Sequence, residues 1–267
     1  MISMMTISRE SSHDPLARTQ GQRDAASLRS RFLKRGFDLA IAGIGLLALW
    51  PVMMLISLAI RLADGGPAIF RQTRIGRHGT PFRIHKFRTM VANAPDFGGG
   101  LTVGQDPRIT RIGALLRRHK LDELPQPIDI VLGHMSLVGP RPEIPELMAY
   151  HGPEKVALIT QMRPGLTDDA SILFRDEGNL LAAAPYPDAY YRNVILPIKY
   201  GYYERYLTEA GIVADLRILV ATAILLITGR IPKAFDRRRT AIPAGFGALP
   251  GGDGRLNQPG RRPEEPI

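Results

Sequence analysis

One uncharged stretch, residues 39–60, constrains this chain more than any other feature. It runs for 22 residues without an acidic or basic side chain. As a straight helix it would be roughly 33 Å long, which is enough to cross the hydrocarbon layer of a membrane. The alternative is a helix buried in a soluble core, but such a helix carries its apolar residues as a stripe. Because this stretch is apolar on every side, the sequence favours a membrane segment.

The flanks of this segment and a central proline bear on how it meets the membrane. Basic residues lie on both sides, namely Arg29, Arg31, Lys34 and Arg35 before it and Arg61, Arg71, Arg74 and Arg77 after it. Since positive charge marks the cytoplasmic side, both ends are expected there. Pro51 removes a helical hydrogen bond and can kink the helix, which predicts a re-entrant helix over residues 31–61. A plain spanning helix with a tolerated proline is the alternative.

Composition divides the rest of the chain. The 267 residues carry a formal net charge of +10, which indicates an anionic partner: nucleic acid, an anionic membrane surface or a phosphorylated substrate. The absence of cysteine excludes disulfides, thiol nucleophiles and cysteine-bound zinc. Residues 1–30 are predicted to be a disordered leader and residues 231–267 a disordered basic tail. Residues 62–230 are therefore expected to form one main domain.

The main domain is predicted to be α+β and mainly helical, with a small β-hairpin. Residues 68–72 and 81–88 alternate apolar and polar side chains and are joined through two glycines, which predicts the hairpin. Residues 91–107 are rich in glycine and are expected to form a loop that could move over a site. Residues 109–119 have the spacing of a helix with an apolar stripe that includes Leu115.

A second apolar segment, residues 216–228, is too short to span a membrane. We expect an amphipathic helix that lies in the membrane interface. At the start of the first segment, Asp38 could pair with Lys34 or Arg35 one turn earlier, which would fix the point of entry into the membrane.

Two adjacent acids, Asp122 and Glu123, follow the most basic stretch of the chain. Residues 71–120 contain nine Arg and two Lys against two Asp. A single guanidinium group can donate two parallel hydrogen bonds to the oxygens of one phosphate. A carboxylate beside such a cluster could hold Mg²⁺ or attack phosphorus. The simpler interpretations are an N-cap for Asp122 and a solvated or lipid-facing basic surface for the arginines. Arg141 stands between two prolines that fix its backbone.

Four motifs follow one another along the chain: Lys34-Arg35-x-x-Asp38, Lys86-Phe87-Arg88-Thr89-Met90, Leu121-Asp122-Glu123-Leu124-Pro125-Gln126 and Met135-Ser136-Leu137-Val138-Gly139-Pro140-Arg141-Pro142. In this order they resemble the motifs of the bacterial sugar transferase family, the monotopic phosphoglycosyl transferases, in their compact form. The resemblance covers about residues 31–228. It implies that a UDP-sugar gives its sugar 1-phosphate to undecaprenyl phosphate and releases UMP. This reaction begins the assembly of exopolysaccharide, O-antigen or a related glycoconjugate.

The resemblance also implies roles for individual residues. Asp122 attacks the sugar-side phosphorus to form a covalent phosphosugar intermediate, and Glu123, with Asp122, holds Mg²⁺. The residues that bind or organise the nucleotide diphosphate are Lys86, Arg88, Arg117, Arg141 and Arg175. The residues that set the re-entrant helix are Lys34, Arg35, Asp38 and Pro51. This helix keeps the catalytic domain on the lipid bilayer, at the cytoplasmic face of the bacterial inner membrane.

The chain departs from the family pattern at a few positions. Many members have a small polar residue before the membrane proline, where this chain has Trp50, and Asp168 and Asp169 add charge near the expected nucleotide or sugar. The identity of the sugar and the formation of a homodimer stay open. The alternative function is a membrane-tethered nucleic-acid-binding protein, suggested by the net charge and an arginine-rich helix. The resemblance favours the enzyme, without a nucleic-acid partner.

Overall fold

The computed structural model describes residues 15–91, 106–233 and 235 of the chain. Residues 1–14, most of the predicted loop over residues 91–107 and nearly all of the predicted tail lie outside the described residues. The described part is mainly helical with two small sheets, which confirms the predicted α+β class.

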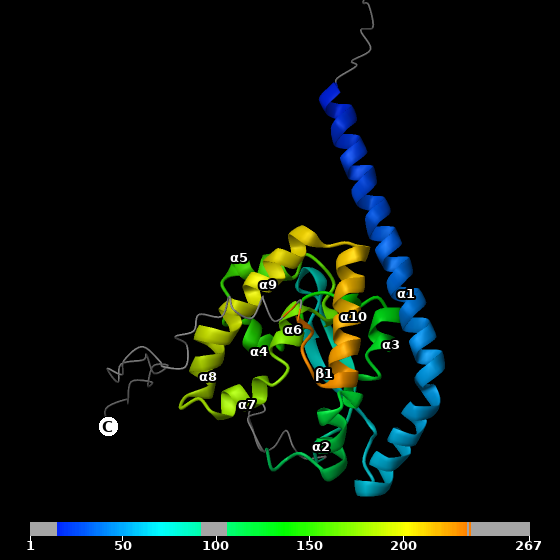
Figure 1. The fold of residues 1–267 in the computed structure, drawn as a ribbon, viewed down its shortest axis with the longest axis vertical. Helices are drawn as coiled ribbons and strands as arrows, with labels where there is room; N and C mark the ends of the chain where they lie inside the picture. The colour runs from blue at the N-terminus through cyan, green and yellow to red at the C-terminus, as the bar shows by residue number, and fades with distance from the viewer. Residues whose placement is uncertain (1–14, 92–105, 234, 236–267) are drawn as a thin grey trace, which may run out of the picture.

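The longest element is α1, Pro15–Asp64, a single helix that contains Pro51. Figure 1 shows its N-terminal turns extending beyond the domain, its middle running along one side of the domain, and its last third bending back. The structure therefore differs from the predicted disordered leader over residues 15–30. Pro15 suits a first helical turn, and the residues after it are mostly strong helix formers such as Leu, Ala, Arg and Gln.

The apolar part of α1 is almost entirely uncovered by protein. Among the described residues, one stretch, Arg31–Ala63, is long and apolar enough to cross a membrane, and only 6% of its most apolar window is buried. Leu47 is 77% exposed and Leu55 is 68% exposed. Such a surface is too apolar to face water, so the expectation of a membrane segment over a soluble core helix is supported.

The predicted hairpin is confirmed. β1, Ile69–Ile75, pairs antiparallel with β2, Pro81–Phe87, in the register Ile69 to Phe87 and Ile75 to Pro81. The turn contains a short 3-10 segment, η1, Arg77–Gly79, in which His78 and Gly79 have φ angles of 57° and 75°. Glycine adopts this left-handed backbone without strain, which explains its place at the predicted turn.

The remaining helices are short, and many start with proline, whose fixed φ suits the first helical position. They are α2 Arg111–Arg118, η3 Leu121–Glu123, α3 Pro127–Val131, α4 Pro145–Met148, α5 Pro153–Ile159, α6 Asp169–Leu173, α7 Glu177–Ala182, α8 Pro187–Tyr190, η4 Tyr191–Ile195, α9 Leu196–Glu209 and α10 Ile212–Thr228. In α2, the Thr110 hydroxyl accepts a hydrogen bond from the Gly113 N–H at 2.9 Å, an N-cap. Leu115, predicted on the buried stripe of this helix, is 57% exposed.

A second, two-stranded sheet lies at the centre of the domain. β3, Ser136–Val138, pairs parallel with β4, Gly165–Thr167. Gly139 and Gly165 lie so close that a Cβ on Gly165 would be 2.2 Å from the Gly139 nitrogen. Only glycine fits there, so this contact fixes where the chain turns after β3.

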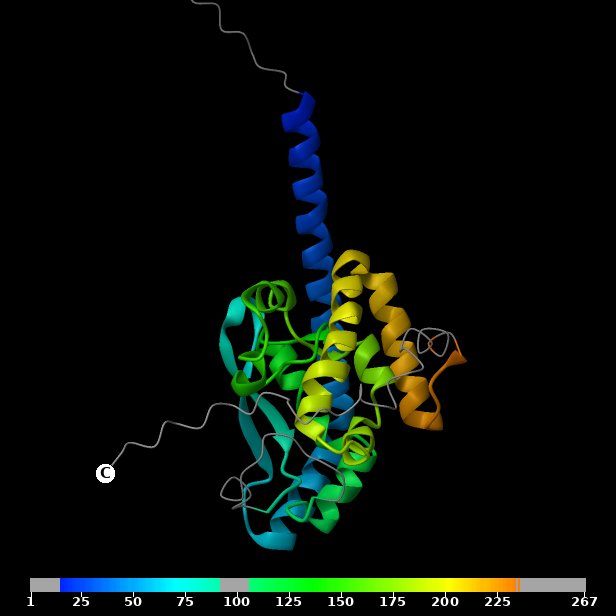
Figure 2. The same ribbon diagram turned by 90° about the vertical axis from the view of Figure 1, so that its left-hand side faces the viewer.

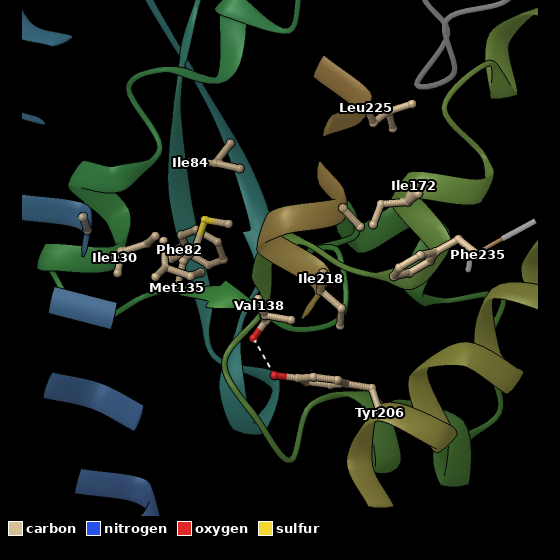
Figure 3. Close-up of a cluster of buried hydrophobic side chains, with 13 residues drawn as sticks. Phe82, Ile84, Ile130, Met135, Val138, Ile172, Tyr206, Ile218, Leu225 and Phe235 are labelled. Carbon is tan, nitrogen blue, oxygen red and sulfur yellow. Dashed lines mark hydrogen bonds between the residues drawn. The ribbon is translucent and has the colours of Figure 1, made fainter. Parts of the chain in front are cut away.

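The main core gathers side chains from the hairpin, α3, β3, α6, α9 and α10 around β3. Figure 3 shows Ile218 of α10 beside Val138, whose carbonyl accepts a hydrogen bond from the Tyr206 hydroxyl at 3.2 Å. Figure 2 shows α9 and α10 side by side, away from the hairpin. The sequence predicted an amphipathic helix here, whereas α10 carries apolar residues on both its buried and its exposed faces. Because α10 is apolar on several faces, it buries Leu225 in the core and still exposes Leu216 and Ile227.

Candidate active site

The acidic pair lies on η3, the single turn between α2 and α3. The residue before this turn, Lys120, has a left-handed backbone with φ 56° and is its N-cap, while Gln126 is the N-cap of α3. Asp122 therefore caps neither element, and the simple capping interpretation is excluded. Its side chain is buried, and its Oδ1 atom accepts no hydrogen bond from any described residue. A buried carboxylate oxygen without a partner is costly, which marks Asp122 as a functional candidate.

Glu123 is held by two cations that come from distant parts of the chain. Its Oε1 atom lies 3.0 Å from Lys86 Nζ, at the end of β2, and 2.5 Å from Arg141 Nη2, between the two prolines. Burial acts to raise the pKa of Glu123, but the charges of Arg141 and Lys86 outweigh it and hold the pKa well below its usual range. Glu123 is therefore a fixed anion at neutral pH.

Asp122 has the opposite electrostatic balance. Burial is the main cause that raises the pKa of Asp122, and the neighbouring charge of Glu123 adds to it. The charge of Lys86 acts in the other direction. Burial lowers the pKa of Lys86 itself, against the attraction of Glu123. Two adjacent acids thus have pKa values that are pushed apart, a pattern found where two carboxylates have different roles.

A large cavity of about 1010 Å³ opens beside the acidic pair. Arg141, which contacts Glu123, lines it, as do Arg117 and Lys120, whose charges act on Asp122. Asp122, Glu123 and Lys86 lie behind this wall and do not line the cavity. Other basic residues on its wall are Arg74, Arg111, Arg118, Arg175 and Lys199. Its size is that of a small-molecule site, and its charge suits a polyanion.

Of the five basic residues predicted to bind substrate, the structure places four around the site. Lys86 and Arg141 contact Glu123, and Arg117 donates from Nε to the Thr89 hydroxyl at 2.8 Å, which holds its guanidinium at the wall of the cavity. Arg175 lies at a different part of the wall, where its Nη1 donates to the Leu225 carbonyl near the end of α10 at 3.4 Å.

Arg88 lies elsewhere. Its guanidinium group packs over Gly66, where a Cβ would come within 2.1 Å of Nη1. It also lines a small cavity with Ile60 and Ala63 at the end of α1. The structure therefore gives Arg88 a place between the membrane helix and the hairpin, away from the wall of the large cavity. Its role in substrate binding stays a prediction.

Asp168 and Asp169, the two acids expected to add charge near the nucleotide or sugar, both make contacts within the fold. Asp168 is the N-cap of α6, since it accepts hydrogen bonds from the Ser171 N–H at 2.8 Å and the Ser171 hydroxyl at 2.7 Å. Asp169 is buried, with its Oδ2 atom 3.7 Å from Arg217 Nη2. Neither lines the large cavity, but the charge of Asp168 acts on Arg141, which does.

The predicted membrane-helix residues dock α1 onto the domain. Lys34 Nζ lies 2.5 Å from Asp215 Oδ2 on α10 and 3.9 Å from Asp38 Oδ1, which is the pairing expected from sequence. Asp38 also accepts hydrogen bonds from the Ser136 hydroxyl at 2.8 Å and the Leu137 N–H at 3.3 Å. Arg35 Nη2 donates to the Val131 carbonyl at 3.3 Å. The entry point of α1 is thus fixed by β3, α3 and α10.

Sequence reasoning missed the partners in two buried clusters. Asp129 is fully buried and accepts from His85 through both the backbone N–H, at 2.9 Å, and Nδ1, at 2.7 Å, which ties α3 to the hairpin. On the cavity wall, the Tyr191 hydroxyl donates to Glu143 at 3.1 Å. For Asp129 the only signal in the sequence is a charged residue within an apolar segment, and for Tyr191 it is a tyrosine-rich stretch. Neither signal predicts which residue is the hydrogen-bond partner.

The acidic pair was also tested as a site for the predicted Mg²⁺. Among the described residues, no group of three or more His, Asp or Glu could hold a metal ion alone. Mg²⁺ is usually held by one or two carboxylates together with substrate phosphates and water. The unpartnered Asp122 Oδ1 and the ionised Glu123 fit such a site, but only with substrate oxygens completing it.

Comparisons with known proteins agree with this geometry. Residues 29–229 match the family described as bacterial sugar transferase. The chain is 48% identical over 110 residues to an exopolysaccharide production protein of Rhizobium leguminosarum. It is 41% identical over 149 residues to the UDP-glucose:undecaprenyl-phosphate glucose-1-phosphate transferase of Escherichia coli. It is 45% identical over 113 residues to a putative undecaprenyl-phosphate N-acetylgalactosaminyl 1-phosphate transferase of Bacillus subtilis.

These matches cover only part of each protein. They include 41%, 54% and 42% of this chain, respectively. They span 55%, 31% and 63% of the length of the three relatives. The family match, residues 29–229, contains the apolar part of α1, the hairpin and the acidic pair.

Proposed function

Since the chain belongs to the bacterial sugar transferase family, we propose that it transfers a sugar 1-phosphate from a UDP-sugar to undecaprenyl phosphate. Two of its relatives are named for transfers of this kind, one of glucose 1-phosphate and one of N-acetylgalactosaminyl 1-phosphate. The product is a lipid diphosphate sugar, on which an exopolysaccharide, an O-antigen or a related glycoconjugate is built. The relative from Rhizobium leguminosarum is named for exopolysaccharide production.

The buried, unpartnered carboxylate of Asp122 beside a cationic cavity is the observation that carries this proposal. A cavity of about 1010 Å³ has room for a nucleotide sugar. Its arginines suit the diphosphate, because each planar guanidinium group can donate two parallel hydrogen bonds to phosphate oxygens. In this proposal, a diphosphate held by Arg117, Lys120 and Arg141 brings its sugar-side phosphorus to Asp122.

In the first step, an oxygen of the ionised Asp122 attacks the phosphorus that carries the sugar. A bond forms between this oxygen and phosphorus, and the bond between phosphorus and the bridging oxygen of the diphosphate breaks. The electron pair of that bond leaves on UMP, and the sugar phosphate stays on Asp122 as an acyl phosphate. The cations around the cavity stabilise the negative charge that develops on the leaving phosphate.

In the second step, a phosphate oxygen of undecaprenyl phosphate attacks the same phosphorus. The bond from phosphorus to Asp122 breaks, the carboxylate returns with its electron pair, and a lipid diphosphate sugar forms. Because the covalent intermediate separates the steps in time, the soluble donor and the lipid acceptor need not occupy the cavity together. Position at the cytoplasmic face of the membrane, held by α1, brings the site within reach of the lipid phosphate.

Glu123 and Asp122 are the proposed protein ligands of a Mg²⁺ ion. A bound Mg²⁺ would neutralise diphosphate charge and orient its oxygens. In the structure Glu123 already has one oxygen engaged by Lys86 and Arg141. Its role in this chain is therefore to keep those two cations in place as well as to offer an oxygen ligand.

The test uses purified full-length protein, Mg²⁺ and a UDP-sugar that carries ³²P in the sugar-side phosphate, without lipid acceptor. We expect label on the protein and release of unlabelled UMP. Asp122→Asn should abolish the labelling, because an amide is a poor nucleophile. Asp188→Asn, an exposed aspartate on α8, makes the same chemical change elsewhere and should label normally. Retained labelling of Asp122→Asn would refute the role of Asp122.

A further inference from the structure

Four arginines form a second cationic site that none of the proposed chemistry uses. Arg31 and Arg35 lie on α1, Arg77 begins η1 in the hairpin turn, and Arg163 precedes β4. We call this set the arginine cluster. None of its members lines the large cavity beside Asp122.

Hydrogen bonds to backbone carbonyls hold three members of the arginine cluster, near the end of α3 and the segment before β4. Arg35 Nη2 donates to the Val131 carbonyl at 3.3 Å, and Arg163 Nε donates to the Gly133 carbonyl at 2.8 Å. Arg77 Nε donates to the Gln161 carbonyl at 3.1 Å, two residues before Arg163. Three separate segments therefore present guanidinium groups to the same region of the surface.

The positive charge of the arginine cluster is not neutralised within the part of the chain that the structure describes. None of the four groups lies within 4.0 Å of a carboxylate there, and the nearby Asp38 is already engaged by Lys34 and Ser136. The Arg35 Nη1 atom is buried and makes no hydrogen bond with a described residue. Burial, and next to it the charge of Arg35, lowers the pKa of Arg163. For Arg77, burial and then the charges of Arg163 and Arg31 lower the pKa.

The position of the arginine cluster along α1 indicates which kind of anion could neutralise its charge. Arg35 lies four residues before the uncharged run, which starts at residue 39. Between Arg31 and Arg35, Phe32 is 77% exposed and Leu33 is 54% exposed. Exposed apolar side chains flanked by basic residues within about one helical turn suit the boundary between headgroups and hydrocarbon, where anionic lipids attract basic residues.

We propose that the arginine cluster binds the phosphate of an anionic phospholipid headgroup beside the point where α1 enters the bilayer. Several guanidinium groups can bind one phosphodiester through paired hydrogen bonds, which a single lysine cannot do. The bound lipid would neutralise the cluster and fix the catalytic domain against the membrane. The inference rests on the membrane position proposed for α1, but not on the chemistry of Asp122.

The experiment compares lipid retention by native mass spectrometry of the full chain, released from detergent that contains phosphatidylglycerol. The test variant is Arg77→Gln with Arg163→Gln. The control is Arg192→Gln with Arg205→Gln, which removes the same charge from η4 and α9. Phosphatidylglycerol should bind about thirtyfold more weakly to the test variant, since each arginine near an anionic lipid contributes roughly a fivefold factor. The control should match the wild type.

Equal retention by the test and control variants would overturn the proposal. Displacement of phosphatidylglycerol by millimolar inorganic phosphate would show a general phosphate site and overturn the lipid assignment. Covalent labelling from UDP-sugar reports whether each variant is folded, and Arg77→Gln alone serves if the change at Arg163 disrupts folding. Wild-type protein that retains the lipid but takes no label would contradict the proposed function and leave this inference standing.

Discussion

Asp122 and Glu123 are neighbours in sequence, yet the fold gives them different electrostatic surroundings. Lys86 and Arg141 both contact Glu123 Oε1, whereas Asp122 Oδ1 has no partner among the described residues. The pair therefore separates into one fixed anion and one carboxylate that desolvation has made more basic. A more basic carboxylate is a better nucleophile, provided that it is ionised at the working pH.

The first prediction concerns the pH dependence of covalent labelling. Burial and Glu123 raise the pKa of Asp122, so the carboxylate gains a proton at a higher pH than an ordinary aspartate, whose value is 3.8. The labelling rate should therefore fall as the pH decreases, with a midpoint above 3.8. In Glu123→Gln the neighbouring negative charge is lost, and the midpoint should move to lower pH. Rates measured from pH 3.5 to pH 8 would show this, and an upward shift would contradict it.

At the scale of single residues, the sequence predicted which residue types form the site better than it predicted where each side chain points. Arg141 between two prolines and Lys86 in its motif were both expected at the site, and both contact Glu123. Arg88 belongs to the same motif as Lys86 but packs over Gly66. The direction of a side chain just after a strand depends on what packs against it, and the motif does not contain that information.

At the scale of elements, one of the contacts that dock α1 onto the domain is an ion pair with a buried carboxylate. Lys34 reaches Asp215, whose side chain is fully buried, and the Tyr206 hydroxyl donates to the same carboxylate. Sequence reasoning predicted the pairing of Lys34 with Asp38, which are one helical turn apart. It could not predict Asp215, because 181 residues separate it from Lys34 and no local pattern links them.

The second prediction is a double-mutant cycle on this ion pair. Lys34→Met should lower the free energy of unfolding by about 3–5 kcal/mol, because it leaves the buried carboxylate of Asp215 without a cation. Asp215→Asn should cost less, because Lys34 is partly exposed and keeps Asp38 nearby. The double variant should lose less than the sum by roughly 1–3 kcal/mol. The exposed pair Arg205 and Glu209, at 2.7 Å, is the control and should give a coupling below about 1 kcal/mol. Additive losses at Lys34 and Asp215 would contradict the docking role.

The third prediction concerns the path of α1 through the membrane. The chain has no cysteine, so a single cysteine at residue 30 or 64 gives an unambiguous label. For the proposed re-entrant helix, both positions should react only with a reagent on the cytoplasmic side. Labelling from opposite sides would refute re-entry and favour a spanning helix. Pro51→Leu restores a backbone N–H and should shift part of the protein towards the spanning form.

At the scale of the whole molecule, the fold class and the hairpin could be predicted because they depend on local patterns. Alternation between polar and apolar residues predicted β1 and β2, and the glycines predicted their turn. The parallel pairing of β3 with β4 depends on the close approach of Gly139 and Gly165. That contact joins distant segments, so three-residue strands of this kind were not predicted. The same limit applies to the arginine cluster, whose members are scattered over the sequence.

The distribution of charge on the whole molecule also separates the proposed enzyme from the alternative, a nucleic-acid-binding protein. Many basic residues of the described structure fall into two separate groups, one lining the cavity beside Asp122 and one where α1 meets the domain, whereas a nucleic-acid surface needs a continuous basic face. A protein that contacts six to ten phosphates of a duplex loses roughly a thousandfold or more in affinity between 50 and 200 mM salt.

The last prediction follows from this difference in charge. A UDP-sugar presents only one diphosphate, so its apparent affinity in the labelling reaction should change by less than about tenfold over the same salt range. A 20-base-pair DNA duplex at micromolar concentration should leave the labelling rate unchanged at 150 mM salt. Inhibition by the duplex, with tight binding retained in Asp122→Asn, would favour the nucleic-acid alternative. If UMP and other UDP-sugars inhibit the labelling reaction and the duplex does not, the net charge of +10 serves to bind small phosphorylated ligands and the membrane.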